Sequence, residues 1–344
     1  MSKTPPDKDV STPQPVVLAT SRSFSSGDLD LAGELAAGGC RVVTGPADHD
    51  LRALRPLLAE AVAWIAGTGP VTAEHLDAAP QLRLVARYGV GVDAVDLTAA
   101  AARGLLVTNT PGANTGAVAD HAVALMLAAL RDVTAGDRGV RAGRWTVRRT
   151  RQLGGLTVGI VGLGRIGREV AARLQGFGST LLGHDPWVDL AQVAALGVEV
   201  VGLDELVRRS DVITLHAPGE EVLVDARLLG HVRPDAILVN TARATLVEES
   251  ALAEALRHGR LRGYAADVLA TESDPSGAGV SPLLADDLVD RTLFTPHAAA
   301  QTVEAVDQMG RGAVDAVLAL VRGEPLPNLV RLPTTVPGGP DGQP

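Results

Sequence analysis

The sequence has 344 residues, of which 46% are hydrophobic and 21% are charged, a balance typical of a globular protein rather than a disordered chain. A chain of this length favours two domains. Its net charge of −9 argues against nucleic acid as the main partner, because phosphate binding needs a basic surface. The single cysteine, Cys40, excludes an intramolecular disulfide and a multi-thiolate metal site, which fits a cytoplasmic protein, and we expect no metal.

The two ends of the chain differ from its middle. Residues 1–15 and 325–344 are rich in proline and polar residues without periodicity, so we expect both to be disordered. Residues 1–15 also lack the apolar core of a signal peptide, and no later stretch reaches the 18 or so apolar residues of a membrane span. The sequence therefore predicts no membrane association.

Strands and helices are predicted to alternate between these ends. The first half has runs rich in β-branched residues at 16–20, 41–44, 61–66, 82–87 and 105–110, separated by helical segments such as 72–79 and 95–103. A long apolar helix is predicted at 114–131, after which the alternation restarts. Further strands are predicted at 157–161, 180–184, 198–201, 212–216, 236–241, 264–268 and 293–295. This order indicates two similarly built α/β halves with parallel sheets.

A glycine-rich motif follows the first strand of the second half. Gly162, Gly164 and Gly167 form G-x-G-x-x-G between a predicted strand and a predicted helix, where they permit a tight turn, close approach of a pyrophosphate and helix–strand packing. Asp185 ends the next strand, where its carboxylate can accept hydrogen bonds from a ribose diol and would repel a 2′-phosphate. We therefore expect NAD rather than NADP. The alternative is that Asp185 is only a turn residue before Pro186.

Four groups capable of chemistry follow later strands. Arg243, Asp267 and His297 lie at predicted strand ends, and Glu272 comes shortly after Asp267. An arginine can bind a carboxylate with two hydrogen bonds, and a histidine paired with a glutamate carries protons near neutral pH. Beside a nicotinamide, this set suits reduction of a 2-oxo acid. Individually, Arg243 could be a surface ion pair, Glu272 a loop carboxylate and His297 a capping residue.

From about Val16 to Arg322 the sequence resembles the NAD-dependent D-2-hydroxyacid dehydrogenases. The matching motifs are RYGVGVDAVDL at 87–97, TNTPGANTGAVADHAVALMLA at 108–128, GIVGLGRIGREVA at 159–171, LHAP at 215–218, ILVNTAR at 237–243, DVLATE at 267–272 and TPHAA at 295–299. The resemblance implies two doubly wound domains, a Rossmann NAD-binding domain inserted into a flavodoxin-like substrate domain. It places the substrate domain at 16–109 with a C-terminal helix at 298–324, and the NAD-binding domain at 110–297.

The resemblance also implies roles for individual residues. Arg243 would bind the substrate carboxylate, His297 would exchange the proton with the 2-oxygen, and Glu272 would hydrogen-bond to His297. The main-chain amides of Val90 and Gly91 would hold the carboxylate as well, with Asn114 near the reacting end. Residues matching cofactor contacts, besides Gly162, Gly164, Gly167 and Asp185, are Arg165, Ile166, His216, Ala217, Pro218, Thr241, Asp267 and His297.

This chain departs from the family pattern at several positions. Ala244 and Thr245 stand where most relatives have glycine next to the arginine, and Ala299 and Ala300 replace glycines after the histidine. The segment after His216 is shorter than usual. We expect the short, phosphoglycerate dehydrogenase-like form without a regulatory domain.

The family also contains NAD-sensing corepressors, so an interaction module remains the alternative to an enzyme. The particular hydroxy acid and the physiological direction stay open.

Arginines concentrate in one stretch of an otherwise acidic chain: Arg138, Arg141, Arg144, Arg148, Arg149 and Arg151. We call residues 138–151 the arginine-rich segment. In the family this region embraces a second subunit, so the resemblance implies a homodimer. Together with Arg87 these residues suggest a second anionic group on the substrate, as in 3-phosphoglycerate or a phosphonate. The alternative is a solvated segment with Arg87 in a structural ion pair.

Overall fold

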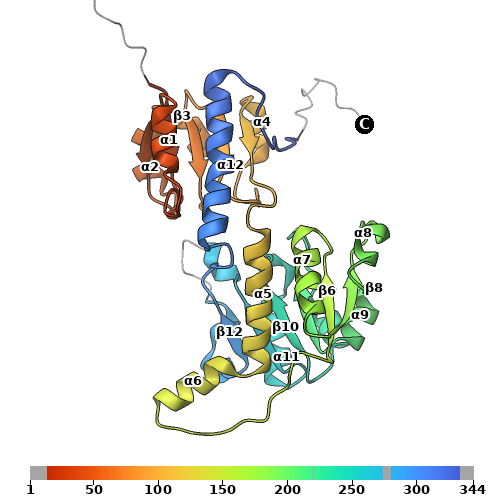
Figure 1. Cartoon of the computed structure of the whole chain (residues 1–344). Helices are drawn as coiled ribbons and strands as arrows, with labels where there is room; N and C mark the ends of the chain where they lie inside the picture. The colour runs from red at the N-terminus through yellow and green to blue at the C-terminus, as the bar shows by residue number, and fades with distance from the viewer. Residues whose placement is uncertain (1–13, 220, 274–279, 334–344) are drawn as a thin grey trace, which may run out of the picture. The chain divides into compact units, whose positions relative to one another are not determined.

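The computed structural model describes residues 14–219, 221–273 and 280–333 (Figure 1). The chain divides into two compact units, one running up to Asn114 and resuming at Val303, the other covering Thr115–Thr302. The sequence placed these divisions at 109/110 and 297/298. Most of the two tails expected to be disordered, residues 1–13 and 334–344, lies outside the described residues.

The first unit is built on a five-stranded parallel sheet with the strand order β2-β1-β3-β4-β5. This is the flavodoxin-like order, in which the chain reverses direction across the sheet between β1 and β3. Its elements are β1 (Val16–Ala19), α1 (Leu31–Ala37), β2 (Arg41–Thr44), α2 (Leu51–Leu58), β3 (Ala61–Ala66), α3 (Ala73–Asp77), β4 (Leu84–Arg87), α4 (Leu97–Ala102), β5 (Leu106–Thr108) and α12 (Val303–Arg322).

The chain after α12 differs from the sequence expectation. Residues from 325 onward were expected to be disordered, but Val330 N–H donates to the Val107 carbonyl at 2.8 Å and Leu329 bridges antiparallel to Thr108. Val330 and Leu332 also pack against the core of the first unit. β5 is an edge strand with unpaired main-chain groups, and two apolar side chains suffice to dock a short segment beside it. The expectation is therefore wrong for this part of the tail.

The second unit has a seven-stranded parallel sheet with the order β12-β11-β10-β9-β6-β7-β8. The elements of this unit are α5 (Thr115–Leu130), α6 (Val133–Arg141), β6 (Thr157–Val161), α7 (Arg165–Gln175), β7 (Thr180–His184), α8 (Leu190–Ala194), β8 (Val198–Val200), α9 (Leu203–Arg209), β9 (Val212–Leu215), α10 (Ala226–Leu229), β10 (Ile237–Asn240), η1 (Ala244–Leu246), α11 (Glu249–Arg257), β11 (Gly263–Ala266), η2 (Ala270–Ser273), η3 (Pro282–Leu284), η4 (Asp286–Leu288) and β12 (Thr292–Phe294).

The order of this sheet confirms the predicted fold class. The chain passes from β6 outward to β7 and β8, then returns to the other side of β6 with β9. This is the Rossmann arrangement, and ligands of such sheets bind at the carboxyl ends of the strands beside the reversal. The glycine-rich motif directly follows β6, so it lies at that reversal.

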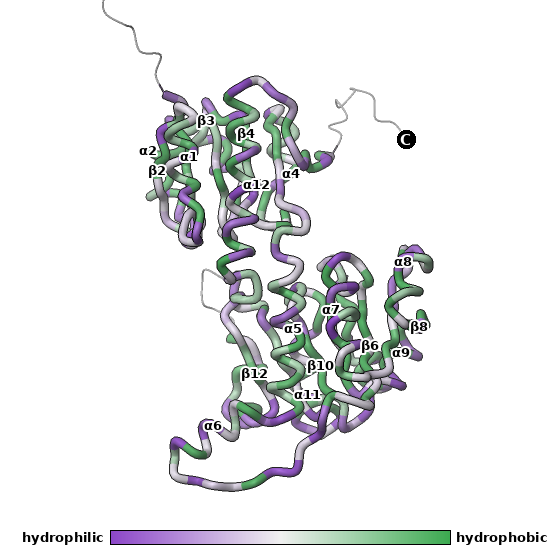
Figure 2. The backbone as a smooth tube through the Cα atoms, in the orientation of Figure 1, coloured by the Kyte–Doolittle hydropathy of each residue, from purple (hydrophilic) through white to green (hydrophobic). Residues whose placement is uncertain are grey.

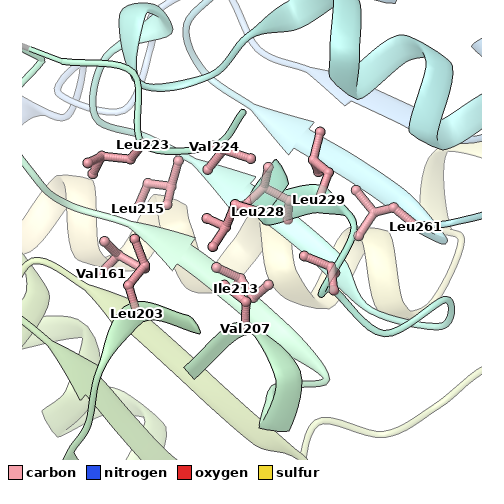
Figure 3. A pocket seen from close by; sticks show the side chains of 12 residues that line it. Val161, Leu203, Val207, Ile213, Leu215, Leu223, Val224, Leu228, Leu229 and Leu261 are labelled. Atoms are coloured by element: carbon pink, nitrogen blue, oxygen red, sulfur yellow. The ribbon is translucent and has the colours of Figure 1, made fainter. Parts of the chain in front are cut away.

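Apolar side chains cover both faces of the seven-stranded sheet. On one face α5 and α7 pack over residues such as Val158, Ile160 and Val239, and Figure 2 shows mostly hydrophobic residues along α5. On the other face α9, α10 and α11 pack over Ile213 and Leu238. This second layer contains a cavity of about 10 Å³, and Figure 3 shows the side chains that line it. It is lined only by valine, leucine and isoleucine, so it is a dry packing defect rather than a ligand site.

Helix α6 was not predicted from the sequence. It begins after Asp132 and contains Gly136 and Gly139, which both weaken a helix, and none of its residues is buried. Its two large apolar residues, Val133 and Val140, are 54% and 46% exposed, so it has no buried face of the kind by which a surface helix is usually recognised. Among the helices of the described residues, none combines the length and the apolar character needed to cross a membrane.

Candidate active site

The three glycines of the motif have the geometry that their spacing predicts. Gly162 has φ of +91°, and a Cβ there would lie 2.6 Å from the main chain of His216. A Cβ on Gly167 would lie 2.0 Å from the Gly162 carbonyl oxygen, so helix α7 can approach β6 only because this residue is glycine. Gly164, at the start of α7, has no atom within 4 Å of the position of a Cβ. Gly164 thus leaves open space over the free N–H groups at the start of α7.

Asp185 lies against this loop. Its Oδ2 accepts a hydrogen bond from the Leu163 N–H at 2.9 Å, and its Oδ1 accepts one from the Trp187 N–H at 2.9 Å. Both oxygens keep a further lone pair, because a carboxylate offers about four acceptor sites. The carboxylate is therefore held at the edge of the glycine loop and can still accept hydrogen bonds from a ribose diol.

Two buried polar atoms at the ends of neighbouring strands lack partners among the described residues. They are Nδ1 of His216, after β9, and the hydroxyl oxygen of Thr241, after β10. Nε2 of His216 forms a hydrogen bond with Thr214 at 2.9 Å, and burial lowers the pKa of His216 to about 3, so the ring is neutral. Buried polar atoms normally have partners. These two, with the open space at Gly164, fit the expected NAD.

Arg243 follows β10 in extended backbone at the start of η1. Asn240 fixes this turn, because its side-chain amide donates to the Arg243 carbonyl at 2.8 Å and its Oδ1 accepts from the Ala242 N–H at 3.0 Å. Nη1 of Arg243 donates to the Ala242 carbonyl at 2.8 Å. The arginine therefore extends from a rigid turn at the carboxyl edge of the sheet.

The structure brings His297 and Glu272 into direct contact. Nδ1 of His297 hydrogen-bonds to Oε1 of Glu272 in η2, and this bond raises the pKa of His297, while burial and Arg243 oppose the rise. Because the Glu272 carboxylate accepts a hydrogen bond from Nδ1–H, Nε2 is the ring nitrogen left to exchange a proton with another molecule. A histidine with a raised pKa and one nitrogen held by a carboxylate is suited to act as a general acid.

Asp267 holds the turn that carries His297. The Asp267 carboxylate, 2% exposed, accepts hydrogen bonds from the Thr295 hydroxyl and from the N–H groups of Ala298 and Ala299, the last two at 2.8 Å. The His297 N–H donates to the Asp267 carbonyl at 2.9 Å. His297 itself has φ of +51°, a conformation that costs energy for a non-glycine residue. Asp267 was expected to contact the cofactor, and here its side chain stabilises the strained turn.

Two supporting residues were not singled out in the sequence. Nε2 of His121 in α5 hydrogen-bonds to the Thr295 hydroxyl at 2.9 Å, which extends the network around Asp267. Glu249, at the start of α11, accepts the Ala270 N–H at 2.8 Å and thereby fixes η2, the turn that carries Glu272. Only the motif around 108–128 drew attention to His121, and no local signal marks Glu249.

The expected substrate residues Arg87, Val90, Gly91 and Asn114 belong to the first unit. Among the described residues the N–H groups of Val90 and Gly91 have no acceptor, and the side-chain oxygen of Asn114 is buried without a partner. Arg87 is only 8% exposed, and its Nη1 donates to the Ala66 carbonyl at 3.1 Å and to the Tyr88 carbonyl at 2.5 Å. These contacts favour a structural role for Arg87 over binding of a second anion.

Most of the arginine-rich segment is paired within its own unit. Arg138 and Arg148 both reach Asp290 at 3.0 Å, Arg141 pairs with Asp137, and Arg151 lies 2.9 Å from Asp211. In the described part of the chain, the side chains of Arg144 and Arg149 have no such partner. Trp145 and Val147, between them, are 82% and 95% exposed.

A family model and several known proteins match this chain. A family model described as "D-isomer specific 2-hydroxyacid dehydrogenase, NAD binding domain" matches residues 123–299. D-3-phosphoglycerate dehydrogenase of Mycobacterium leprae is 43% identical over 269 residues, which are 76% of this chain and 49% of that protein. Glyoxylate reductase of Korarchaeum cryptofilum is 41% identical over 272 residues, 76% of this chain and 80% of that protein. The chain spans about half the length of the D-3-phosphoglycerate dehydrogenases it matches.

Solved structures are also similar to this chain. The TT0316 protein of Thermus thermophilus is 34% identical with a TM-score of 0.80 and covers 92% of this chain and 100% of its own. D-lactate dehydrogenase of Aquifex aeolicus, complexed with NAD and lactic acid, is 26% identical with a TM-score of 0.78, over 90% of this chain and 96% of its own.

Proposed function

Because the chain belongs to the D-isomer specific 2-hydroxyacid dehydrogenase family and contains its NAD-binding domain, we propose that it interconverts a D-2-hydroxy acid and the corresponding 2-oxo acid with NAD. The observation that carries this proposal is the His297–Glu272 pair, held at the carboxyl edge of a Rossmann sheet. Asp267 holds the turn that carries His297, and Glu249 holds the turn that carries Glu272.

We propose that NAD is held at the glycine loop, with its pyrophosphate over Gly164, Arg165 and Ile166 and its adenosine ribose on Asp185. His216, Ala217, Pro218 and Thr241 would contact its remaining parts, and the unpartnered atoms of His216 and Thr241 support this. When bound, the nicotinamide supplies or accepts the hydride. The preference for NAD over NADP rests on the negative charge of Asp185.

The chain's own residues would bind the acid and move one proton. The Arg243 guanidinium would bind the carboxylate with two hydrogen bonds and polarise the 2-oxo group, with the amides of Val90 and Gly91 and the side chain of Asn114 as further contacts. In the reductive direction Nε2–H of His297 donates its proton to the 2-oxygen, and in the oxidative direction it takes that proton back. Glu272 stabilises the imidazolium in both.

The test is steady-state oxidation of NADH by the purified protein with glyoxylate, pyruvate, hydroxypyruvate and 3-phosphohydroxypyruvate. The proposal predicts turnover with at least one of them and formation of the D-isomer. Binding of NADH without turnover of any 2-oxo acid would instead support an NAD-sensing interaction module.

The finer proposal is that the substrate carries a second anionic group, as a phosphorylated or phosphonate 2-hydroxy acid does. The names of several relatives support it, as do Arg144 and Arg149, which have no carboxylate partner in the described residues. Arg144→Ala with Arg149→Ala should then raise the KM for 3-phosphohydroxypyruvate and leave that for glyoxylate unchanged. Equal effects on both acids would rule out a phosphate contact.

We also propose that the protein is a cytoplasmic homodimer. The exposed Trp145 and Val147 support a partner surface on the arginine-rich segment, because these two large apolar side chains lie close together in the sequence and their burial would be favourable. Light scattering should give twice the mass of the chain for the wild type and a lower mass for Trp145→Ser.

A further inference from the structure

The short segment after β9, described at residues 216–219 and 221–224, is tied by main-chain hydrogen bonds to the residues that follow Arg243. Leu223 and Val224 both donate main-chain hydrogen bonds to the Leu246 carbonyl at 2.9 Å, and Val224 accepts one from the Glu248 N–H at 3.0 Å. Val224 and Val247 thus form a parallel bridge. The far end of the segment is therefore fixed to the residues that follow η1.

At Gly219 the same segment touches Arg243 itself. A Cβ on Gly219 would lie 2.6 Å from both Cβ and Cγ of Arg243 and 2.7 Å from the Thr245 hydroxyl oxygen. Real side chains never come this close, so the main chain of Gly219 lies directly on the aliphatic part of the arginine. This contact limits the positions that the Arg243 side chain can adopt.

Thr245 closes this contact with a hydrogen bond. Its hydroxyl donates to the Gly219 carbonyl at 2.9 Å. The two departures noted in the sequence, the short segment after His216 and the side chain at position 245, therefore meet in one contact. The bond is exposed to solvent, so its value lies in orienting Gly219 rather than in stabilising the fold.

We propose that Thr245 is a positioning residue for Arg243: its hydrogen bond to Gly219 holds the segment after β9 against the arginine and so presents the guanidinium to the substrate carboxylate. This inference rests on the proposed function, since it assigns Arg243 to the carboxylate. It predicts that the segment and the arginine respond together to changes at either position 219 or 245.

The test compares Thr245→Val, which keeps the shape and removes the hydroxyl, with Thr245→Ser, which keeps the hydroxyl. Oxalate serves as a carboxylate probe that is not reduced, and its binding to the NADH-bound protein is followed by NADH fluorescence. Thr245→Val should weaken oxalate binding roughly threefold to tenfold, the range for loss of one hydrogen bond, with NADH affinity changed less than about twofold. Thr245→Ser should restore the wild-type value.

Gly219→Ala provides a second, independent variant, because its methyl group must displace Arg243. It should weaken oxalate binding more than Thr245→Val, whereas Gly202→Ala, where a Cβ meets no atom within 4 Å, should have no effect. Wild-type oxalate binding in Thr245→Val, or equal loss in the valine and serine variants, would overturn the inference. Since oxalate binding requires no turnover, an inactive wild type would contradict the proposed function alone.

Discussion

The most constrained residue of the candidate site is His297, which has a left-handed backbone and a ring nitrogen held by Glu272. Glu272→Gln removes the charge that raises the pKa of His297. Reduction of a 2-oxo acid needs the protonated ring, so activity falls as pH rises through this pKa. We expect the basic limb of the pH profile of kcat to move to lower pH in Glu272→Gln.

The control for that profile is Glu74→Gln, an exposed carboxylate of α3 in the first unit and outside the network. Its basic limb should coincide with that of the wild type. A Glu272→Gln profile superimposable on the wild type would remove Glu272 from the proton path and leave His297 with another partner.

We expect Asp185 to determine the preference for NAD over NADP. Asp185→Ala removes the charged acceptor for the ribose diol together with the repulsion of a 2′-phosphate, so the ratio of kcat/KM for NADH over NADPH should fall about tenfold or more. Since the carboxylate also holds Leu163 N–H, thermal unfolding should be measured alongside. A wild type that uses both cofactors equally would contradict this role.

A buried histidine in the first unit should make stability depend on pH. Burial lowers the pKa of His49 to about 4 from its ordinary 6.5, while its ring bonds to Thr20 at 2.6 Å and to the Pro70 carbonyl at 3.0 Å. The unfolded chain therefore binds the proton first as pH falls, so the contribution is full above about 6.5 and is lost towards 4. It amounts to about 3 kcal/mol.

Urea unfolding at pH 7 and pH 5 checks this. The free energy of unfolding should fall less between these values in His49→Asn than in the wild type, since asparagine also tolerates the left-handed backbone at this position, φ +59°. An identical fall in both proteins would assign the pH dependence to other groups, such as His216.

At the scale of single residues, sequence motifs predicted the residues of the candidate site but not the residues that hold them in place. The glycines, Arg243, Glu272 and His297 could be predicted because their chemistry is tied to spacing from strand ends. The anchoring by Asp267, the contact of Glu249 with η2 and the environment of His49 could not, because each depends on residues far apart in sequence.

At the scale of elements, two substitutions in the turn between β6 and α7 should separate an effect on folding from an effect on cofactor binding. Gly162→Ala places a methyl group 2.6 Å from the main chain of His216 at φ +91°, whereas the same change at Gly164 meets open space. We expect Gly162→Ala to lower the melting temperature, and Gly164→Ala to keep it while weakening NADH binding, because the new methyl occupies the approach of the pyrophosphate.

Differential scanning fluorimetry and NADH fluorescence titration measure these two effects separately. Unchanged NADH affinity in Gly164→Ala would argue that the pyrophosphate lies elsewhere, and wild-type stability in Gly162→Ala would show that the turn can relax around the new side chain.

Most of the strands were predictable because they are short runs of apolar residues buried in the sheet, as β6, β9 and β10 are, and such runs are required wherever a parallel sheet is covered on both faces. Helix α6 and the segment around Val330 were not. The first has no buried residue and contains two glycines, and the second gains its structure from the edge of β5. Local sequence cannot show a neighbour that supplies half of the interaction.

For the whole molecule, the alternation of strands and helices predicted two parallel sheets, and the resemblance supplied the insertion of one domain into the other. The strand orders themselves depend on pairing between distant segments, such as β6 with β9. The carboxyl edge beside this pair gathers the glycine loop, Asp185, Thr241, Arg243 and His297 from separate strands of one sheet. This arrangement supports the proposed dehydrogenase site.

The most direct test of this account follows the hydride and the proton together. With NADH deuterated at the transferred position of the nicotinamide, the wild type should convert a 2-oxo acid of the panel into the D-2-hydroxy acid with deuterium on C2. His297→Gln should bind NADH as the wild type does and lose about 10²- to 10⁴-fold in kcat. Product without deuterium on C2, or a His297→Gln protein with near-normal turnover, would contradict the account.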